Sequence, residues 1–535
     1  MIQRILLTVG ILSSCCLPPG TADDSHPLPT ASENAQQIDR FLADHWAELR
    51  VAPAPLCSDR TFVRRAYLDL TGRVPTTAET ENFLKDGREN RRFALIELLT
   101  NSEDFVQHFT DLFDTLLMGR GSDRDYEQRH KHQWRSWLER VFRENQPWNT
   151  AAAEILRARP TTPADSGAVW FLYERKEKYQ DIAEAVAPAF FGIRIECAQC
   201  HDHMIAHEIE QQHYWGLVAF FNRGKNVNTK RGPRVAESAV GGFSEFATLD
   251  GTSKPNLLTF FEADVVEEPR PEKDAKEEDR DDLYTPGSDD APRIPRFSRR
   301  EHFVTDIVAE HPLLATAFVN RIWAILLARG LVHPFDEMDS VHPPSHPELL
   351  KWLADDFRSS GYDIRRLIQT VAMCRAWQLS SQQPEGVEDS STFSWYLERP
   401  LTAEQLARSI QLTLRGRFAN DSPLVGNVRN AFPDVLPDES ISTIRETLFL
   451  SNNPAINQFI HESSASGSLL DRLFSLPDHN QRTALLFETL FCRDADSDEH
   501  QAISDYLGSD PDQLKPRLEH VIWSLLTSAE FRFNH

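Results

Sequence analysis

Apolar and polar residues alternate along most of this chain with the period of an α-helix. Apolar side chains recur three or four positions apart between residues 36 and 221, and again from residue 299 to the end. This spacing places them on one face of a helix. The clearest helices are expected at residues 36–49, 61–70, 92–99, 105–117, 134–142, 182–191 and 213–221. The chain is therefore predicted to be mainly α.

Local signals for helix starts support this prediction. A Ser or Thr followed three residues later by Glu or Gln forms a capping box, in which both side chains bond free backbone N–H groups. Three such pairs open apolar runs: Thr76 with Glu79, Ser345 with Glu348, and Thr402 with Gln405. Each is expected to begin a helix.

The pattern changes in the middle of the chain. Glycines and a proline separate short apolar runs between residues 223 and 261, which predicts a small β-rich insertion. Residues 262–290 then hold 13 acidic and 4 basic side chains, a composition typical of a solvated segment. We expect two helical domains, at 34–222 and 299–535, with the β insertion (223–261) and an acidic disordered linker (262–298) between them.

Length and charge limit the classes of protein. At 535 residues the chain is long enough for two or three hydrophobic cores. Its formal net charge of −24 argues against a nucleic-acid partner, because phosphate binding needs clustered Lys and Arg.

The first 22 residues resemble an export signal. Arg4 precedes an apolar run at residues 5–12, and small residues follow. Cleavage after Ala22 would release a soluble protein, whereas processing at Cys15 would leave a lipid anchor, and both alternatives stay open. No later run approaches roughly 18 apolar residues, so no transmembrane span is expected. The predicted location is the periplasm or cell envelope.

One short motif carries chemistry. Cys197, Cys200 and His201 form a CxxCH pentapeptide, the attachment signature of a c-type haem. Two thiols can add to the two vinyl groups of one porphyrin, and the next imidazole can bind the iron as proximal ligand. A random chain of this composition would contain about 0.003 such pentapeptides. The predicted cofactor is therefore a covalent haem c.

Other chemistry at this motif stays open. The alternatives are a zinc site, a redox-active dithiol and a disulfide. Zinc needs four ligands, and His203, His207 or His213 could complete a set with the two thiols. The remaining mature cysteines, Cys57, Cys374 and Cys492, are isolated in sequence and are expected to be buried as small hydrophobes.

The sixth iron ligand decides between electron transfer and peroxide or oxygen chemistry. His203 and Met204 lie within three residues of His201, so either would reach the opposite porphyrin face poorly. A ligand from another helix is easier geometrically. The candidates are His108, His130 and His132.

A second group of polar residues lies in the C-terminal half. It comprises Asn320, Arg321, Trp323, Asp336, Asp339, Ser345, His346 and Glu348. These residues could line a pocket for a polar substrate such as a glycan. Helix capping and the pinning of neighbouring loops account for them more simply.

Several longer runs resemble two known families. Residues 64–72 (RRAYLDLTG) and 191–203 (FGIRIECAQCHDH) resemble the planctomycete cytochrome-type domain of unknown function 1549. Residues 319–323 (VNRIW), 330–332 (GLV), 344–350 (PSHPELL) and 530–535 (EFRFNH) resemble its companion, domain of unknown function 1553. The resemblance implies a cytochrome-type haem site and no settled reaction. The residues after His203 depart from the family's usual Asp-His-Pro-Phe.

The leading hypothesis is an exported haem c protein that transfers electrons or oxidises an extracytoplasmic, polysaccharide-related substrate, with a redox partner. The rival is a non-redox structural or carbohydrate-interaction protein whose CxxCH binds zinc or forms a disulfide.

Overall fold

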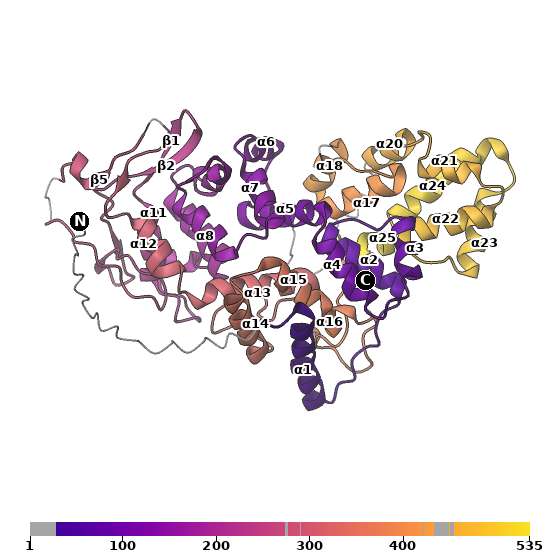
Figure 1. Cartoon of the computed structure of the whole chain (residues 1–535), viewed down its shortest axis with the longest axis horizontal. Coiled ribbons are helices and arrows are strands. Elements are labelled where there is room, and N and C mark those ends of the chain that lie inside the picture. Colours follow the sequence, from indigo (N-terminus) through magenta and orange to yellow (C-terminus); the bar gives the residue numbers. More distant parts are fainter. Residues whose placement is uncertain (1–27, 273–276, 289, 421, 433–448, 450–453) are drawn as a thin grey trace, which may run out of the picture.

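The computed structural model describes residues 28–272, 277–288, 290–420, 422–432, 449 and 454–535. The expected signal peptide and Cys15 lie outside these residues. The molecule is elongated, with the strands labelled β1, β2 and β5 near one end and the helices labelled α21 to α24 near the other (Figure 1). The described residues are mainly helical, which confirms the predicted class. No helix among them is both long and apolar enough to cross a membrane.

The N-terminal helices form the middle of the molecule. They are α1 (Ala31–Leu49), α2 (Asp59–Thr71), α3 (Thr77–Lys85), α4 (Arg91–Thr100), α5 (Glu103–Met118), α6 (Asp123–Lys131), α7 (Trp134–Arg143), α8 (Trp148–Arg157), the 3-10 helix η1 (Pro163–Val169) and α9 (Trp170–Tyr173). The CxxCH region follows as α10 (Tyr179–Val186), the π-helix η2 (Ala187–Phe191), the 3-10 helix η3 (Glu196–Gln199) and α11 (Gln211–Phe221).

All the described strands form two-stranded antiparallel sheets. The central pairs are β1 (Gly224–Thr229) with β2 (Gly232–Glu237), β3 (Glu245–Ala247) with β4 (Ser253–Pro255), and β5 (Tyr284–Thr285) with β6 (Ile294–Pro295). In the first pair Gly224 lies opposite Glu237. A short 3-10 helix, η4 (Asp281–Leu283), precedes β5.

The described part of the acidic stretch is not a free linker. Glu268 forms ion pairs with Arg223 (2.7 Å) and Arg299 (2.6 Å), and its side chain is 11% exposed. Tyr284 in β5 is buried. These contacts attach the stretch to Arg223, between α11 and β1, and to Arg299, where the next helix begins. This differs from the disordered linker expected from composition. The physical reason is that part of its acidic charge is neutralised by arginines that are distant in sequence.

The C-terminal half returns to helices. They are α12 (Arg299–His302), the π-helix η5 (Phe303–Val308), α13 (Pro312–Leu327), α14 (Pro347–Ser359), α15 (Ile364–Met373), α16 (Arg375–Gln378), the 3-10 helix η6 (Ser390–Thr392), α17 (Ala403–Arg415), α18 (Pro423–Ala431), α20 (Pro454–Glu462), α21 (Leu469–Ser475), α22 (His479–Phe491), α23 (Ser497–Leu507), α24 (Pro511–Leu526) and α25 (Ala529–Arg532). Strand β7 (Arg399–Pro400) pairs with β8 (Phe533–Asn534).

Two of the three predicted capping boxes are present. Thr76 and Thr402 each accept a hydrogen bond from the backbone N–H three residues on. The side chains of Glu79 and Gln405 in turn accept a hydrogen bond from the backbone N–H of Thr76 and Thr402. The box predicted at Ser345 is wrong. Helix α14 begins at Pro347 with His346 as its N-cap, and the Ser345 hydroxyl donates to the carbonyl oxygen of Leu331 instead (3.2 Å).

Two hydrophobic cores divide the chain near residue 400. The first contains apolar side chains from Ala35 to Tyr396, on both sides of the acidic stretch. The second contains those from Leu401 to Phe531, joined by Leu68 and Val74 of the N-terminal half. The helices from η5 to α16 therefore share a core with the N-terminal helices. The cores do not follow the division at 262–298 that composition suggested.

A buried polar cluster joins α2 to the C-terminal end of the chain. The Asp69 carboxylate accepts hydrogen bonds from Trp377 Nε1 (2.9 Å) and the Tyr396 hydroxyl (3.1 Å), and it pairs with Arg399. Asn534 of β8 also donates to it. Because Asp69 is fully buried, these donors replace the water that its charge has lost. The runs at 64–72 and 530–535 therefore contact each other.

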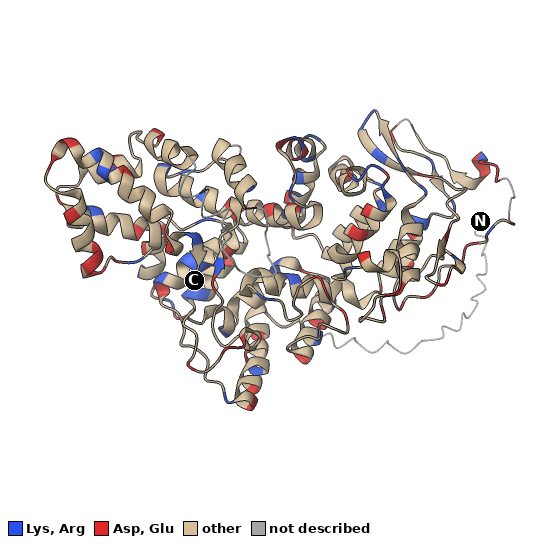
Figure 2. Cartoon of the chain, turned by 180° about the vertical axis from the view of Figure 1, so that it is seen from behind, with Lys and Arg blue, Asp and Glu red and all other residues tan. Residues whose placement is uncertain are grey.

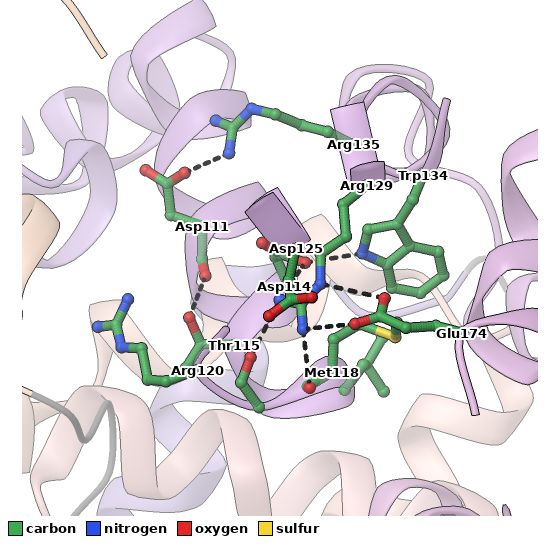
Figure 3. A network of polar contacts seen from close by, with 12 residues as sticks. Asp111, Asp114, Thr115, Met118, Arg120, Asp125, Arg129, Trp134, Arg135 and Glu174 are labelled. Carbon is green, nitrogen blue, oxygen red and sulfur yellow. Dashed lines mark hydrogen bonds and ion pairs between the residues drawn. The ribbon is translucent and has the colours of Figure 1, made fainter. Parts of the chain in front are cut away.

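Charged residues of both signs are interspersed along the ribbon (Figure 2). Some pair in the interior, where Arg135 Nη1 lies 2.6 Å from Asp111, and Trp134 Nε1 donates to Asp114 (2.8 Å; Figure 3). Asp111 also pairs with Arg408 of α17, which belongs to the other core's helices. These pairs connect α5 to α7 and α17.

Candidate functional site

The chain reaches the CxxCH motif through a π-helix. The apolar helix expected at 182–191 is present as α10 followed by η2. Pro188 lies in η2 and cannot donate a backbone hydrogen bond, so a regular α-helical ladder cannot continue through it. Gly192 then ends the helix at φ +66°, and a Cβ added there would lie 2.7 Å from Met338 Sδ. Only glycine combines this backbone conformation with so close a neighbour.

The two thiols and the imidazole lie at the surface. Cys197 is in η3, Cys200 follows it, and both are exposed free thiols. His201 is half-buried, and its Nδ1 lies 2.7 Å from the carbonyl oxygen of Asp202. A carbonyl can only accept, so Nδ1 is the donor, and in the neutral imidazole Nε2 keeps its lone pair. The imidazole is therefore in the tautomer that binds a metal through Nε2.

Helix α11 fixes the CxxCH turn through hydrogen bonds. The Gln199 carbonyl accepts hydrogen bonds from Trp215 Nε1 (3.1 Å) and Gln211 Nε2 (3.3 Å). The Asp202 carboxylate accepts from the backbone N–H of Gln211 (2.7 Å), the first residue of α11. The backbone on both sides of Cys200 and His201 is thus fixed by one helix.

A pocket of about 540 Å³ lies beside His201. Its walls are His201, Asp202, Met204 and Gln211 on one side, and Thr248, Leu249, Asp250, Thr252 and Lys254 of the β3–β4 hairpin on the other. Gln211 Nε2 also donates to the Ala247 carbonyl (3.0 Å), which ties the hairpin to α11. Met204 and Leu249 are 78% and 82% exposed. These two side chains give an otherwise polar pocket some exposed apolar surface.

The histidines nearest the motif have structural partners. His203 Nδ1 accepts a hydrogen bond from the Ala206 N–H (2.8 Å), and His213 Nδ1 accepts from the Glu210 N–H (3.2 Å). The His213 ring also stacks on Phe261, and burial lowers its pKa. His207 is exposed. None of the three lines the pocket beside His201.

The more distant histidines are also placed elsewhere. His108 is buried on α5, where desolvation lowers its pKa to about 3. His130 is exposed on α6, and His132 stacks on Trp170 with the ring centroids 4.3 Å apart. The structure brings none of these to the pocket wall, whereas Met204 shares that wall with His201.

A strap from the C-terminal half holds the chain on both sides of the motif. Arg321 donates to the carbonyls of Ala189 (2.8 Å) and Pro188 (2.7 Å) in η2. Arg194, just before η3, pairs with Asp336 (3.0 Å). Further contacts are those of Met338 N with the Gly192 carbonyl (2.8 Å), Glu337 with Arg194 (3.2 Å) and Ser340 Oγ with Glu208 (2.9 Å). Residues 336–340, which make all of these contacts except those of Arg321, are named the strap.

The other polar residues predicted for the C-terminal half do not form one pocket with Arg321 and Asp336. Asn320 is buried and bonds the backbone of Val332 through both ends of its amide. Trp323 is buried in the first core, and Asp339 accepts from His342. His346 contacts the His45 ring, and burial lowers its pKa to about 4. Glu348 is exposed in the first turn of α14. These residues fix loops and helix ends.

The thiols do not sit in a preformed metal cage. Among the described residues, no group of three or more His, Cys, Asp or Glu side chains is arranged to hold a metal ion. Cys57, Cys374 and Cys492 are buried, as predicted, and burial raises the pKa of the Cys374 and Cys492 thiols. The exposed pair at 197 and 200 is therefore chemically distinct from the other described cysteines.

These features define a mainly helical protein that presents a thiol–imidazole motif at its surface. Residues 37–226 match the family model PSCyt2, described as a protein of unknown function (DUF1549). Residues 299–421 match PSD1, described as a protein of unknown function (DUF1553). The chain therefore combines both domains, as the sequence runs indicated. No curated protein and no solved structure matches it.

Sequence reasoning missed three supports of the motif: Gln211, Trp215 and the strap. The apolar pattern at 213–221 predicted a helix there, but not that its polar and indole N–H groups face Gln199. The strap lies more than 130 residues from the motif in sequence, as the Arg194–Asp336 separation of 142 shows. No local pattern could reveal it.

Proposed function

We propose that this chain is an exported redox protein that carries one covalent haem c at Cys197, Cys200 and His201. The observation that carries the proposal is that both thiols are exposed and that the imidazole of His201, the residue after Cys200, lines an open pocket of about 540 Å³. Covalent attachment needs accessible thiols, and iron binding needs a free Nε2.

The residues present fit the group. Cys197 and Cys200 would hold the porphyrin edge, and His201 would bind the iron from the proximal side. The Asp202 carbonyl orients the imidazole, while Met204 and Leu249 supply apolar surface that would shield the ring from water. The bound group supplies one-electron redox chemistry, and peroxide or oxygen chemistry if its sixth position is open.

The proposed location is the periplasm or cell envelope. The support is the N-terminal sequence, in which an apolar run follows Arg4 and two processing sites compete. Attachment of haem c takes place on the exported side of the membrane, so location and cofactor agree. Cleavage near Ala22 gives a soluble protein, and processing at Cys15 gives a lipid-anchored one. A redox partner and an oxidisable polysaccharide-related substrate belong to the same proposal.

The test is expression in a host with haem c maturation. We expect a Soret band and an intact mass larger than that of the polypeptide by one haem, both retained after acid–acetone extraction. Cys197→Ser with Cys200→Ser should remove both signals, and Cys57→Ser, at a buried thiol, should leave them unchanged. Full-length protein without a Soret band would refute the proposal. Stoichiometric zinc, or a Cys197–Cys200 disulfide, would support the rival instead.

A further inference from the structure

A further pocket lies where α8 packs against η5 and the start of α13. Its volume is about 500 Å³, and none of the CxxCH residues line it. Residues 149–165 form one side of this pocket and residues 304–314 form the other. The two sides belong to the two regions that match different family models. Both domains are therefore needed to build the pocket.

One wall of this pocket carries an excess of negative charge. The carboxylates of Glu154 and Asp165 line it, and an oxygen of each lies 3.1 Å from Nη2 of the same arginine, Arg140. Two carboxylates that share one guanidinium leave one negative charge over. Oε1 of Glu154 accepts a single hydrogen bond, from Gln146, and Oδ1 of Asp165 accepts only that of Arg140 among the described residues. Because a carboxylate oxygen can accept two hydrogen bonds, each has one position left for a ligand.

The neighbouring wall carries an excess of positive charge. Arg157 and Arg159 line it, and they pair with Glu301 (3.0 Å) and Glu237, respectively. The buried Arg300 also pairs with Glu237 (3.4 Å), so three guanidinium groups share two carboxylates. Arg157 uses only its Nε in the ion pair with Glu301, and no described residue is hydrogen-bonded to its two Nη groups. These Nη groups are suited to bind the carboxylate of a ligand.

The two charged walls lie next to each other, and the floor of the pocket is apolar. Glu154 and Arg157 are three residues apart on α8, so their side chains are neighbours on the helix surface. They pair with other residues, Arg140 and Glu301, rather than with each other. The floor comes from apolar side chains of the second domain, which are Val304, Val308 and Leu314. The pocket thus offers a negative, a positive and an apolar surface side by side.

We propose that this pocket binds a free α-amino acid with an aliphatic side chain. The carboxylate of the ligand binds the Nη groups of Arg157, its ammonium donates to Glu154 Oε1 and Asp165 Oδ1, and its side chain lies on the apolar floor. A zwitterion neutralises both excess charges at once, whereas a simple anion or cation is repelled by one of the two walls. The site goes beyond the proposed function, and it does not depend on a bound haem.

The test is isothermal titration calorimetry of the full chain at pH 7, with L-leucine as the probe. We expect saturable binding at one site. L-Leucinamide lacks the carboxylate and N-acetyl-L-leucine lacks the ammonium, so each should bind about tenfold or more weakly, because a hydrogen bond between charged groups is lost. Glycine, which lacks the aliphatic side chain, should also bind more weakly. D-Glucose, a neutral ligand rich in hydroxyl groups, should not bind.

Two variants assign the charged groups of the ligand to the two walls. Arg157→Gln should weaken leucine binding by about tenfold and leave leucinamide binding unchanged, because leucinamide has no carboxylate for Arg157 to bind. Asp165→Asn should weaken leucine binding and leave N-acetyl-L-leucine binding unchanged, because that ligand has no ammonium. The matched control is Arg143→Gln, the same change at an exposed arginine that pairs with Glu103 on the surface, and it should bind leucine like the unaltered protein.

Three results would overturn the proposal. They are no binding of leucine by the folded protein, equal affinity for leucine and its two derivatives, and binding of glucose in place of leucine. An equal loss of leucine and leucinamide binding in Arg157→Gln would also overturn it, because Arg157 would then shape the pocket without binding the carboxylate. Circular dichroism of each variant separates these outcomes from misfolding. The Soret band plays no part in this test, so the haem proposal can fail or stand independently.

Discussion

Replacing Arg321 by Met tests whether the C-terminal half holds the CxxCH region. Arg321 is 3% exposed, and its two terminal nitrogens donate to the carbonyls of Pro188 (2.7 Å) and Ala189 (2.8 Å). A hydrogen bond from a charged donor contributes about 1.5–3 kcal/mol, so the two bonds contribute about 3–6 kcal/mol. Met fills much of the same volume and removes the cost of burying a cation. We expect a net loss of about 3 kcal/mol.

The assay is urea unfolding followed by tryptophan fluorescence. It reports the first core, which contains the buried tryptophans from Trp46 to Trp395. The control is Arg88→Met, the same chemical change at an exposed residue whose described ion-pair partner is Asp86, and its midpoint should not move. Amide exchange at residues 189–200 should rise in Arg321→Met alone. A loss below about 1 kcal/mol with unchanged exchange would show that water replaces the arginine and that Arg321 does not support the CxxCH region.

Two further predictions concern residues next to the site. Gly192→Ala should destabilise the first core by about 1–3 kcal/mol, because the residue has φ +66° and its new Cβ would press on Met338 Sδ. The control is Gly416→Ala, at φ +68° with open space around it, which should show only the backbone strain of about 1–2 kcal/mol. Equal losses of stability in the two variants would contradict the contact with Met338. Burial lowers the pKa of His311 from 6.5 to about 4, so between these values the unfolded chain binds a proton that the folded chain does not. The contribution of this residue to the free energy of unfolding is full above pH 6.5 and falls by about 3 kcal/mol as the pH drops to 4. His311→Asn, which can still cap α13, should flatten this dependence of stability on pH in urea titrations at pH 4 to 7. An unchanged slope would mean that other groups cause it.

The helices were predictable because their signals are local. Apolar periodicity located α1, α2 and α11, and the capping boxes at Thr76 and Thr402 depend only on residues three apart. The failure at Ser345 has a non-local cause. Its hydroxyl bonds the carbonyl of Leu331, 14 residues earlier, and this contact takes the side chain away from the helix end. A local rule cannot detect a competing partner outside its window.

The arrangement of cores was not predictable for the same reason. The sequence shows which faces are apolar, but not which faces meet. The acidic stretch separated the halves by composition, yet Glu268 pairs with Arg223 before it and Arg299 after it. The ion pairs among these three residues thus cross the predicted domain boundary. Helix α13 also packs against η2 in the first core.

The CxxCH motif could be found from sequence because its chemistry needs a fixed spacing of three residues. Its surroundings could not. The pocket wall comes from the hairpin at Leu249, the turn is held by Trp215, and the entering helix is held by Arg321. Each lies on a different segment, and none of the three has a spacing rule that connects it to Cys197.

The polar residues of the C-terminal half fix loops and helix ends, which is the simpler of the two interpretations that the sequence allowed. Arg321 and Asp336 belong to the part of the chain that matches one family model, and the η2 and Arg194 segment that they bind belongs to the part that matches the other. If the strap supports the motif, loss of either half should impair the same site. This gives a physical reason for the two domains to occur in one chain, because the first supplies the thiols and the second supplies the contacts that hold their backbone.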